Sequence, residues 1–252
     1  MKIVFMSGGA REKALKYLLE KKENVVAVIT PYLSDKNRRF ENVILTAAEY
    51  GIPIFSVDKN NVESTLEKID FDTLISCGFS YILSEKIISK AKHAINVHPT
   101  LLPQYRGFRS GPYIIINDEK QSGVTIHFIT GEMDKGDILL QQAFELSKFD
   151  TTKSVYKKVQ ELEQGLLYKA IQMLKTGQFK TLPQNENKAS VYNYIRTPKD
   201  SEIDWNKPLK ALYNEIRACD PNDYPAFFYV EGQKVCIKLW RPDKLKDEED
   251  MI

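Results

Sequence analysis

The chain has few of the side chains that build disulfide frameworks or zinc sites. It contains three cysteines and three histidines in 252 residues. Cys77, Cys219 and Cys236 are widely spaced, and there is no C-x-x-C motif and no His/Cys cluster. This pattern indicates reduced thiols in a cytoplasmic protein, and it gives no reason to expect a metal site.

The chain also lacks a surplus of one charge and a long apolar run. Its 36 Lys and Arg residues nearly balance 34 Asp and Glu residues, which leaves a formal net charge of +2. This balance gives no indication of nucleic acid binding. No run reaches the roughly 20 apolar residues of a membrane span, and the N-terminal apolar run is too short for a signal peptide. We therefore expect a globular protein whose partners are neither nucleic acid nor membrane.

The first half of the chain alternates short apolar runs with amphipathic segments. The pattern predicts strands at 3–6, 25–30, 52–55, 73–76 and 94–97, and helices at 10–22, 42–50, 61–68 and 84–89. Continuous apolar strands that alternate with helices predict an α/β fold, with a mostly parallel Rossmann-like sheet and helices on both faces. Active sites in such sheets lie at the carboxyl ends of the strands.

The second half predicts a different arrangement. Residues 123–130 and 137–144 read as a hairpin, and 154–176 as a long helix that ends at Gly177. Pro183 lies in a polar loop that marks a boundary. We expect one domain at 1–182, a small C-terminal α+β module at 190–242 and a charged, disordered tail at 243–252. The module would hold a helix at 208–218 and a β-hairpin from 226–230 and 234–240.

Three side chains near strand ends carry the clearest chemical signal. Asn96 and His98 are two positions apart, so they face the same side of an extended strand, and Asp134 lies in a turn rich in glycine. An amide can stabilise an oxyanion, an imidazole can move protons, and a carboxylate can orient the imidazole and raise its pKa. These are the groups needed to transfer an acyl group to an amine. His127 lies inside a strand and reads as a structural histidine.

These residues belong to motifs that resemble a known family. N-V-H-P-T-L-L-P-Q-Y-R-G at 96–107, G-V-T-I-H at 123–127 and D-K-G-D-I at 134–138 resemble the formyltransferases that use N10-formyltetrahydrofolate. The resemblance covers roughly residues 70–218 and extends to I-D-W at 203–205 and to 216–227. It implies the formyltransferase fold, a catalytic domain at 1–182, a catalytic role for Asn96, His98 and Asp134, and N10-formyltetrahydrofolate as the cosubstrate without a metal.

The resemblance also implies binding residues. Those expected for the folate are Phe79, Ser80, Tyr81, Ile82, Leu83, Thr130 and Gly131, although Ile82 and Leu83 could equally be core residues. Those expected for the acceptor are Tyr105, Arg106, Gly107, Phe108, Arg109, Arg217 and Tyr224, of which the last two could instead meet a neighbouring subunit. Gly8 and Gly9 are added because they follow the first strand in a position suited to phosphate binding. Gly8 and Gly9 could instead form only a tight turn, and the two arginines of the 105–109 loop could form surface ion pairs.

The acceptor is inferred from the length of the chain and its tail. They resemble the sugar nucleotide N-formyltransferases, which formylate an amino-dideoxy sugar on dTDP, UDP or GDP for bacterial surface glycans such as O-antigen lipopolysaccharide and capsule. Aromatic residues are dense in 192–240, which predicts a homodimer through the C-terminal module. The alternatives are an enzyme that formylates methionyl-tRNA, as initiator tRNA, and a folate-binding protein without catalysis.

Overall fold

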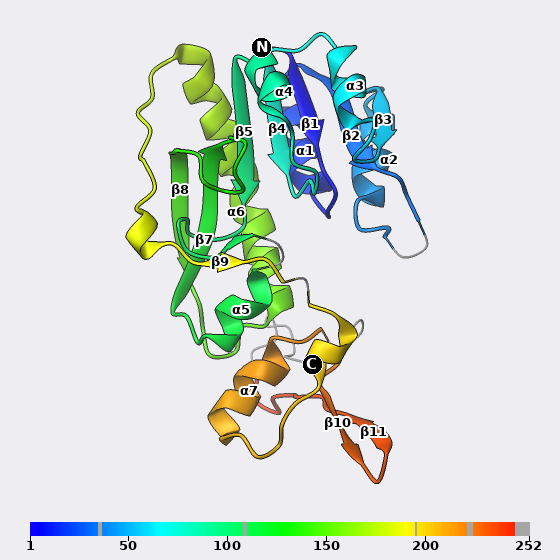
Figure 1. The fold of residues 1–252 in the computed structure, drawn as a ribbon, viewed down its shortest axis with the longest axis vertical. Coiled ribbons are helices and arrows are strands. Elements are labelled where there is room, and N and C mark those ends of the chain that lie inside the picture. The colour runs from blue at the N-terminus through cyan, green and yellow to red at the C-terminus, as the bar shows by residue number, and fades with distance from the viewer. Residues whose placement is uncertain (35–36, 108–109, 195, 221–223, 245–252) are drawn as a thin grey trace.

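A seven-stranded sheet forms the centre of the molecule (Figure 1). The computed structural model describes residues 1–34, 37–107, 110–194, 196–220 and 224–244. The strands lie in the order β3-β2-β1-β4-β5-β7-β8. The first five in this order are parallel to one another, whereas β7 pairs antiparallel with both β5 and β8. Their bounds are β1 Ile3–Met6, β2 Val25–Pro31, β3 Ile54–Val57, β4 Thr73–Cys77, β5 His93–His98, β7 Gln121–Phe128 and β8 Ile138–Glu145.

Helices cover both faces of this sheet because successive side chains of a buried strand point to opposite faces. On β1, Ile3 and Phe5 pack in one apolar cluster, and Val4 and Met6 pack in the other. The first cluster includes α1 (Glu12–Glu20), α2 (Glu41–Glu49) and α6 (Thr152–Thr176), and the second includes α3 (Val62–Glu67) and α4 (Glu85–Lys90). The expected mainly parallel α/β fold is confirmed.

A long return segment follows α6, which ends at Gly177 in the left-handed conformation. The segment crosses the β7–β8 side of the molecule and pairs as β9 (Val191–Tyr192) with β6 (Arg106–Gly107), next to the helix α5 (Gly111–Ile116) (Figure 1). Two short 3₁₀ helices, Glu186–Lys188 and Pro198–Ser201, flank this pairing. The sequence did not predict β6 or β9, because two-residue strands have no periodicity to detect.

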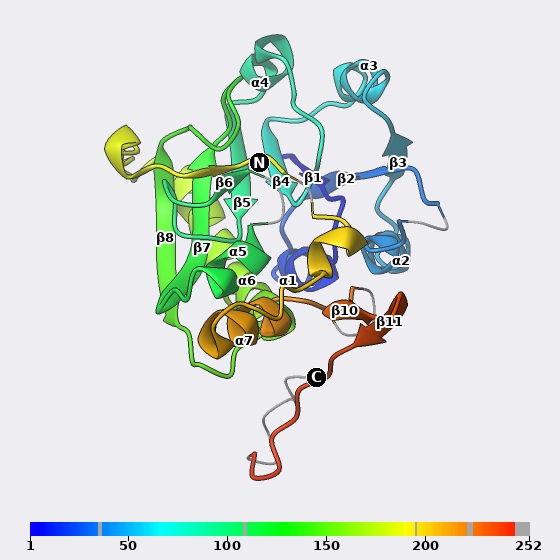
Figure 2. The same ribbon diagram turned by 60° about the horizontal axis from the view of Figure 1, so that its bottom comes forward.

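The C-terminal part lies below α5 and contains α7 (Leu209–Arg217) and a two-stranded hairpin (Figures 1 and 2). Strands β10 (Phe227–Val230) and β11 (Gln233–Cys236) are joined by Glu231 and Gly232, both at positive φ, as in the tight turns that suit hairpins. The hairpin is as expected, but β11 ends at Cys236 rather than at residue 240. Of the expected tail at 243–252, residues 245–252 lie outside the described part.

Within the described ranges, no helix has the length and apolarity that crossing a membrane requires. The same ranges contain no group of three or more His, Cys, Asp or Glu side chains that could hold a metal ion.

Candidate active site

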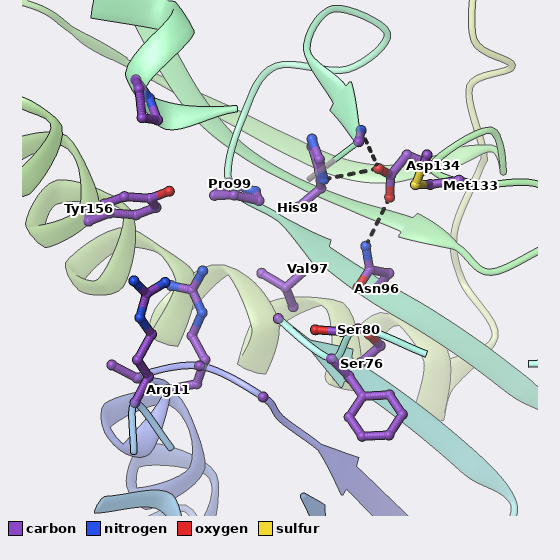
Figure 3. Close-up of a pocket in the computed structure, with 18 of the residues that line it drawn as sticks. Arg11, Ser76, Ser80, Asn96, Val97, His98, Pro99, Met133, Asp134 and Tyr156 are labelled. Atoms are coloured by element: carbon purple, nitrogen blue, oxygen red, sulfur yellow. Dashed lines mark hydrogen bonds and ion pairs between the residues drawn. The ribbon is translucent and has the colours of Figure 1, made fainter. Parts of the chain in front are cut away.

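Asn96 and His98 lie at the end of β5, in the middle of the sheet, and face the same side (Figure 3). The antiparallel register between β5 and β7 places Asn96 opposite His127 and His98 opposite Thr125. His127 Nε2 is 3.0 Å from Asn96 Nδ2. The sequence placed His127 as a structural histidine, whereas the structure brings it into the same cluster. The sequence does show that His127 and Thr125 are two positions apart and so face the same side of a strand. It does not show that this strand pairs with the one that carries Asn96 and His98.

Asp134 reaches this cluster from the turn between β7 and β8. Its φ is +54°, an uncommon conformation that Asp and Asn adopt more readily than most residues. Its Oδ1 accepts from Asn96 Nδ2 at 3.3 Å, and its Oδ2 accepts the Gly107 N–H at 2.9 Å. The carboxylate also lies 3.5 Å from both His98 Nδ1 and His127 Nε2. The three residues expected to be catalytic are therefore brought together around one carboxylate (Figure 3).

The charge state of the cluster follows from burial and these contacts. Burial raises the pKa of Asp134, but the two histidines and the Gly107 N–H outweigh it, and the net pKa lies well below the ordinary value. For His98, burial is the largest influence and lowers the pKa, while the charge of Asp134 acts to raise it. The charge of Asp134 therefore raises the pKa of His98, as expected, but by less than burial lowers it. At neutral pH the arrangement is an ionised carboxylate beside a neutral imidazole.

The ring of His98 has a defined tautomer in this orientation. Its Nε2 lies 2.8 Å from the carbonyl oxygen of Tyr105, which can only accept, so Nε2 carries the proton. Nδ1 is then the basic nitrogen, and it faces Asp134 Oδ2 at 3.5 Å. A proton taken up at Nδ1 would form an imidazolium next to the carboxylate. The pair is arranged to accept a proton during a reaction.

Arg106 is buried and supports the turn that carries Asp134. Arg106 is 1% exposed, and its guanidinium donates to the two carboxylate oxygens of Glu186 at 2.9 and 2.7 Å. It also donates to Gln184 Oε1, while Gln184 Nε2 donates to the carbonyl oxygens of Asp134 and Gly136 at 2.8 and 2.7 Å. The expectation that Arg106 meets the acceptor finds no support in this position, because its guanidinium is engaged in holding the turn.

The cluster opens into a cavity of about 870 Å³. On the β4 side the cavity is lined by Thr130 and by the expected folate segment Phe79, Ser80, Tyr81, Ile82 and Leu83. Leu83 is 4% exposed and packs in the core, while Ile82 is 64% exposed. Core packing therefore accounts for Leu83 but not for Ile82. Gly131 lines a smaller neighbouring hollow instead.

The residues expected to bind the acceptor divide into two groups. Gly8, Gly9, Gly107 and Tyr224 line the cavity, whereas Tyr105, Arg106 and Arg217 do not. Tyr105 is buried, and its hydroxyl binds Glu119. Phe108 and Arg109 lie outside the described residues.

Arg217 is a buried structural residue and does not line the cavity. Its Nε donates to Asn214 Oδ1 at 2.9 Å, and its NH1 donates to the carbonyl oxygen of Asp150 at 2.6 Å. These contacts join α7 to the segment that precedes α6, so they explain its burial without a ligand.

Basic side chains that the sequence analysis did not select also line the cavity. They are Arg11, Arg39, Lys153, Lys157 and Arg196. They come from four separate segments of the chain, so no local motif could reveal them. A cavity lined by both an acid–base centre and several cations suits a ligand with a reacting group and an anionic group.

Comparisons with known proteins identify a family. The sequence model of the formyl transferase family matches residues 1–171, and that of the formyl transferase C-terminal domain matches residues 196–251. A methionyl-tRNA formyltransferase of Halalkalibacterium halodurans is 32% identical over 254 residues, which cover 97% of this chain and 79% of that protein.

Solved structures with the same fold include sugar-modifying enzymes. A 4-N formyltransferase from Francisella tularensis is 26% identical, with a TM-score of 0.76 and coverage of 94% of this chain and 96% of that one. An N-formyltransferase from Helicobacter canadensis, in complex with folinic acid and dTDP-3-aminofucose, is 23% identical with a TM-score of 0.72. Its match covers 93% of this chain and 85% of that chain.

Proposed function

Because the chain belongs to the formyl transferase family, we propose that it transfers the formyl group of N10-formyltetrahydrofolate to the amine of a nucleotide-linked amino sugar. The product would be a formylated sugar for bacterial surface glycans. Folate would bind at 79–83 and Thr130, and the nucleotide diphosphate at the lining cations Arg39, Lys153, Lys157 and Arg196.

One observation carries the choice of acceptor. A single cavity connects the segment 79–83, the centre around His98 and the cations of α6. Lys153 and Lys157 are one helical turn apart on the first turns of α6, so both can lie along an extended anion. The relative from Helicobacter canadensis binds a folate derivative and a dTDP sugar together, which supports the same pair of ligands here.

In the proposed reaction the unprotonated amine attacks the formyl carbon. The new C–N bond gives a tetrahedral intermediate, and Asn96 would stabilise its oxyanion. The amine proton would pass to His98 Nδ1, where Asp134 stabilises the imidazolium. Collapse breaks the bond to N10 of the folate, and His98 returns the proton to that nitrogen. Holding both reactants in one cavity would supply much of the rate.

The test is formyl transfer from N10-formyltetrahydrofolate to a panel of amino sugars on dTDP, UDP and GDP. We expect turnover of one panel member and its loss in His98→Ala. Replacing Lys153 and Lys157 together by alanine should raise KM for the nucleotide sugar and leave KM for the folate unchanged within twofold. The exposed Lys86, which pairs with Glu67, provides the matched control as Lys86→Ala. Absence of turnover across the panel would refute the proposal.

A second acceptor, the amine of methionyl-tRNA, is favoured by the 32% identity to the Halalkalibacterium halodurans enzyme. The same assay with initiator methionyl-tRNA distinguishes the two. A tRNA acceptor should give a steep loss of activity as salt rises, because many phosphate contacts release counterions. A nucleotide sugar has one diphosphate and should show a weaker dependence.

We further propose that residues 190–242 form a dimerisation module. The hairpin exposes Tyr229, Val230 and Val235, and two strands alone are marginally stable in water. A second copy packed on this surface would cover it. Sedimentation velocity at micromolar concentration should show a dimer, and Tyr229→Ser with Val230→Ser should shift it to monomer. Leu45→Ser, at an exposed position on α2, is the control. A monomeric wild type would refute the proposal.

A further inference from the structure

Arg11 and Glu163 form an ion pair at the wall of the cavity that the proposed reaction does not use. Arg11 NH1 lies 3.0 Å from Glu163 Oε2, and the side chains are 9% and 0% exposed. Glu163 lies on the apolar face of α6, with Val159 and Leu166 one turn away on either side. Arg11 precedes α1, so the pair joins the first helix to the longest one.

Stability alone gives a poor account of this pair. Removing two charges from water costs free energy that their attraction often fails to recover, and apolar side chains of similar volume usually stabilise a core as well. The surroundings of Glu163 are already apolar, and an apolar residue would suit that face of α6. This raises the question of what Arg11 does at the cavity.

The guanidinium of Arg11 has donors to spare. Its NH1 faces Glu163 and is shielded from solvent, so the donors that can face the cavity are those on Nε and NH2. Arg11 lines the cavity together with Gly9, Gly78 and Tyr156, whereas Glu163 does not line it. A Cβ atom at Gly78 would lie 3.5 Å from Arg11 Nε, so the side chain runs close along the loop after β4. Figure 3 shows Arg11 across the open space from Pro99 and His98.

The charge of Glu163 determines which kind of ligand group Arg11 can bind. Glu163 compensates the positive charge, so the pair presents N–H donors with little net charge. A phosphate or carboxylate placed there would meet the nearby Glu163 charge as well as that of Arg11. A neutral hydroxyl oxygen accepts from a guanidinium without that penalty. The anionic part of an acceptor would instead lie against Arg39, Lys153, Lys157 and Arg196, which also line the cavity.

We propose that Arg11, held in place by Glu163, is a specificity-determining residue that donates a hydrogen bond to a hydroxyl group on the amino sugar ring. The inference rests on the proposed function, since it names a sugar as the acceptor. The sugar would lie between His98 and Arg11, with its amine at His98. A site that binds a substrate hydroxyl discriminates strongly against an analogue without it, because its donors are then left unpaired.

The test compares kcat/KM for the accepted amino sugar nucleotide and for analogues in which one ring hydroxyl at a time is replaced by hydrogen. The wild type should disfavour one of these deoxy analogues by about a hundredfold or more. The double variant Arg11→Met with Glu163→Met removes both charges, so neither is left buried alone. It should reduce that ratio to below about fivefold, and Arg11→Lys should give an intermediate ratio. Thermal melting establishes that each variant is folded.

A matched control is the exposed ion pair of Arg38 and Glu41, neither of which lines the cavity. Arg38→Met with Glu41→Met should keep the wild-type ratio. A wild-type ratio near one for every analogue, or a ratio that survives in the double variant, would overturn the role of Arg11. So would a preference for an acceptor with a carboxylate in place of the hydroxyl. If the wild type formylates no amino sugar at all, the proposed function fails and this inference fails with it.

Discussion

Replacing Asp134 by asparagine should remove most of the activity and also move its pH dependence. Asparagine has the same shape, tolerates the positive φ of this position, and keeps an oxygen that can accept the Gly107 N–H. The turn should therefore persist. What the variant loses is the charge that faces His98 Nδ1 at 3.5 Å.

The size of the loss follows from that distance. Two unit charges about 4 Å apart attract by roughly 4 kcal/mol at an effective dielectric constant of about 20. In the proposed reaction His98 gains its charge only as the amine proton arrives, so most of this attraction would appear in the transition state. At about 1.4 kcal/mol for each factor of ten, kcat should fall by roughly a hundredfold to a thousandfold.

The pH profile separates this electrostatic role from a loss of structure. Burial lowers the pKa of His98 and the charge of Asp134 acts against it. A neutral His98 is needed to accept the proton, so wild-type activity should fall as the pH drops below this pKa, which lies below 6.5. Without the carboxylate the pKa falls further, and the acid limb of kcat against pH should move to lower pH.

The assay is kcat for formyl transfer between pH 4.5 and 9, with Asp137→Asn as the control. Asp137 lies three positions further along the same turn and accepts from Thr181 Oγ1, outside the lining of the cavity. The control should keep the wild-type rate and profile. A loss below tenfold in Asp134→Asn, or an acid limb that stays in place or moves up, would refute the reasoning.

Three further predictions concern stability and are measured by urea denaturation. Gly107→Ala should destabilise the fold by about 2 kcal/mol or more, because its φ is +103° and a Cβ would lie 2.3 Å from the carbonyl oxygen of Tyr192; a loss below about 0.5 kcal/mol would contradict this. Gly165→Ala is the matched control, and should stabilise α6 by about 0.5–1 kcal/mol because its Cβ meets nothing within 4 Å; a loss of stability would contradict it. Arg106→Met should lower the urea midpoint, since it removes the hydrogen bonds of the buried guanidinium to Gln184 and to the exposed carboxylate of Glu186 and so releases the Asp134 turn, and an unchanged midpoint would count against that role.

The sequence alone determined most of the framework. Apolar runs bounded by polar turns predicted the strands β1 and β2, because a strand buried on both faces is mostly apolar. The alternation of side chains placed Asn96 and His98 on one face of β5, and the glycine-rich turn placed Asp134 after a strand. These are properties of short stretches of chain, and local geometry decides them.

Only the tertiary structure decided which distant residues meet. His127 joins the centre because β7 pairs with β5 in one particular register, and Arg106 does not line the cavity because Gln184 and Glu186 return to bind it. The pair of Arg11 with Glu163 links positions 152 residues apart. Periodicity reports which face of an element is buried but not what covers it, so contacts between separate elements appear only when the chain is folded.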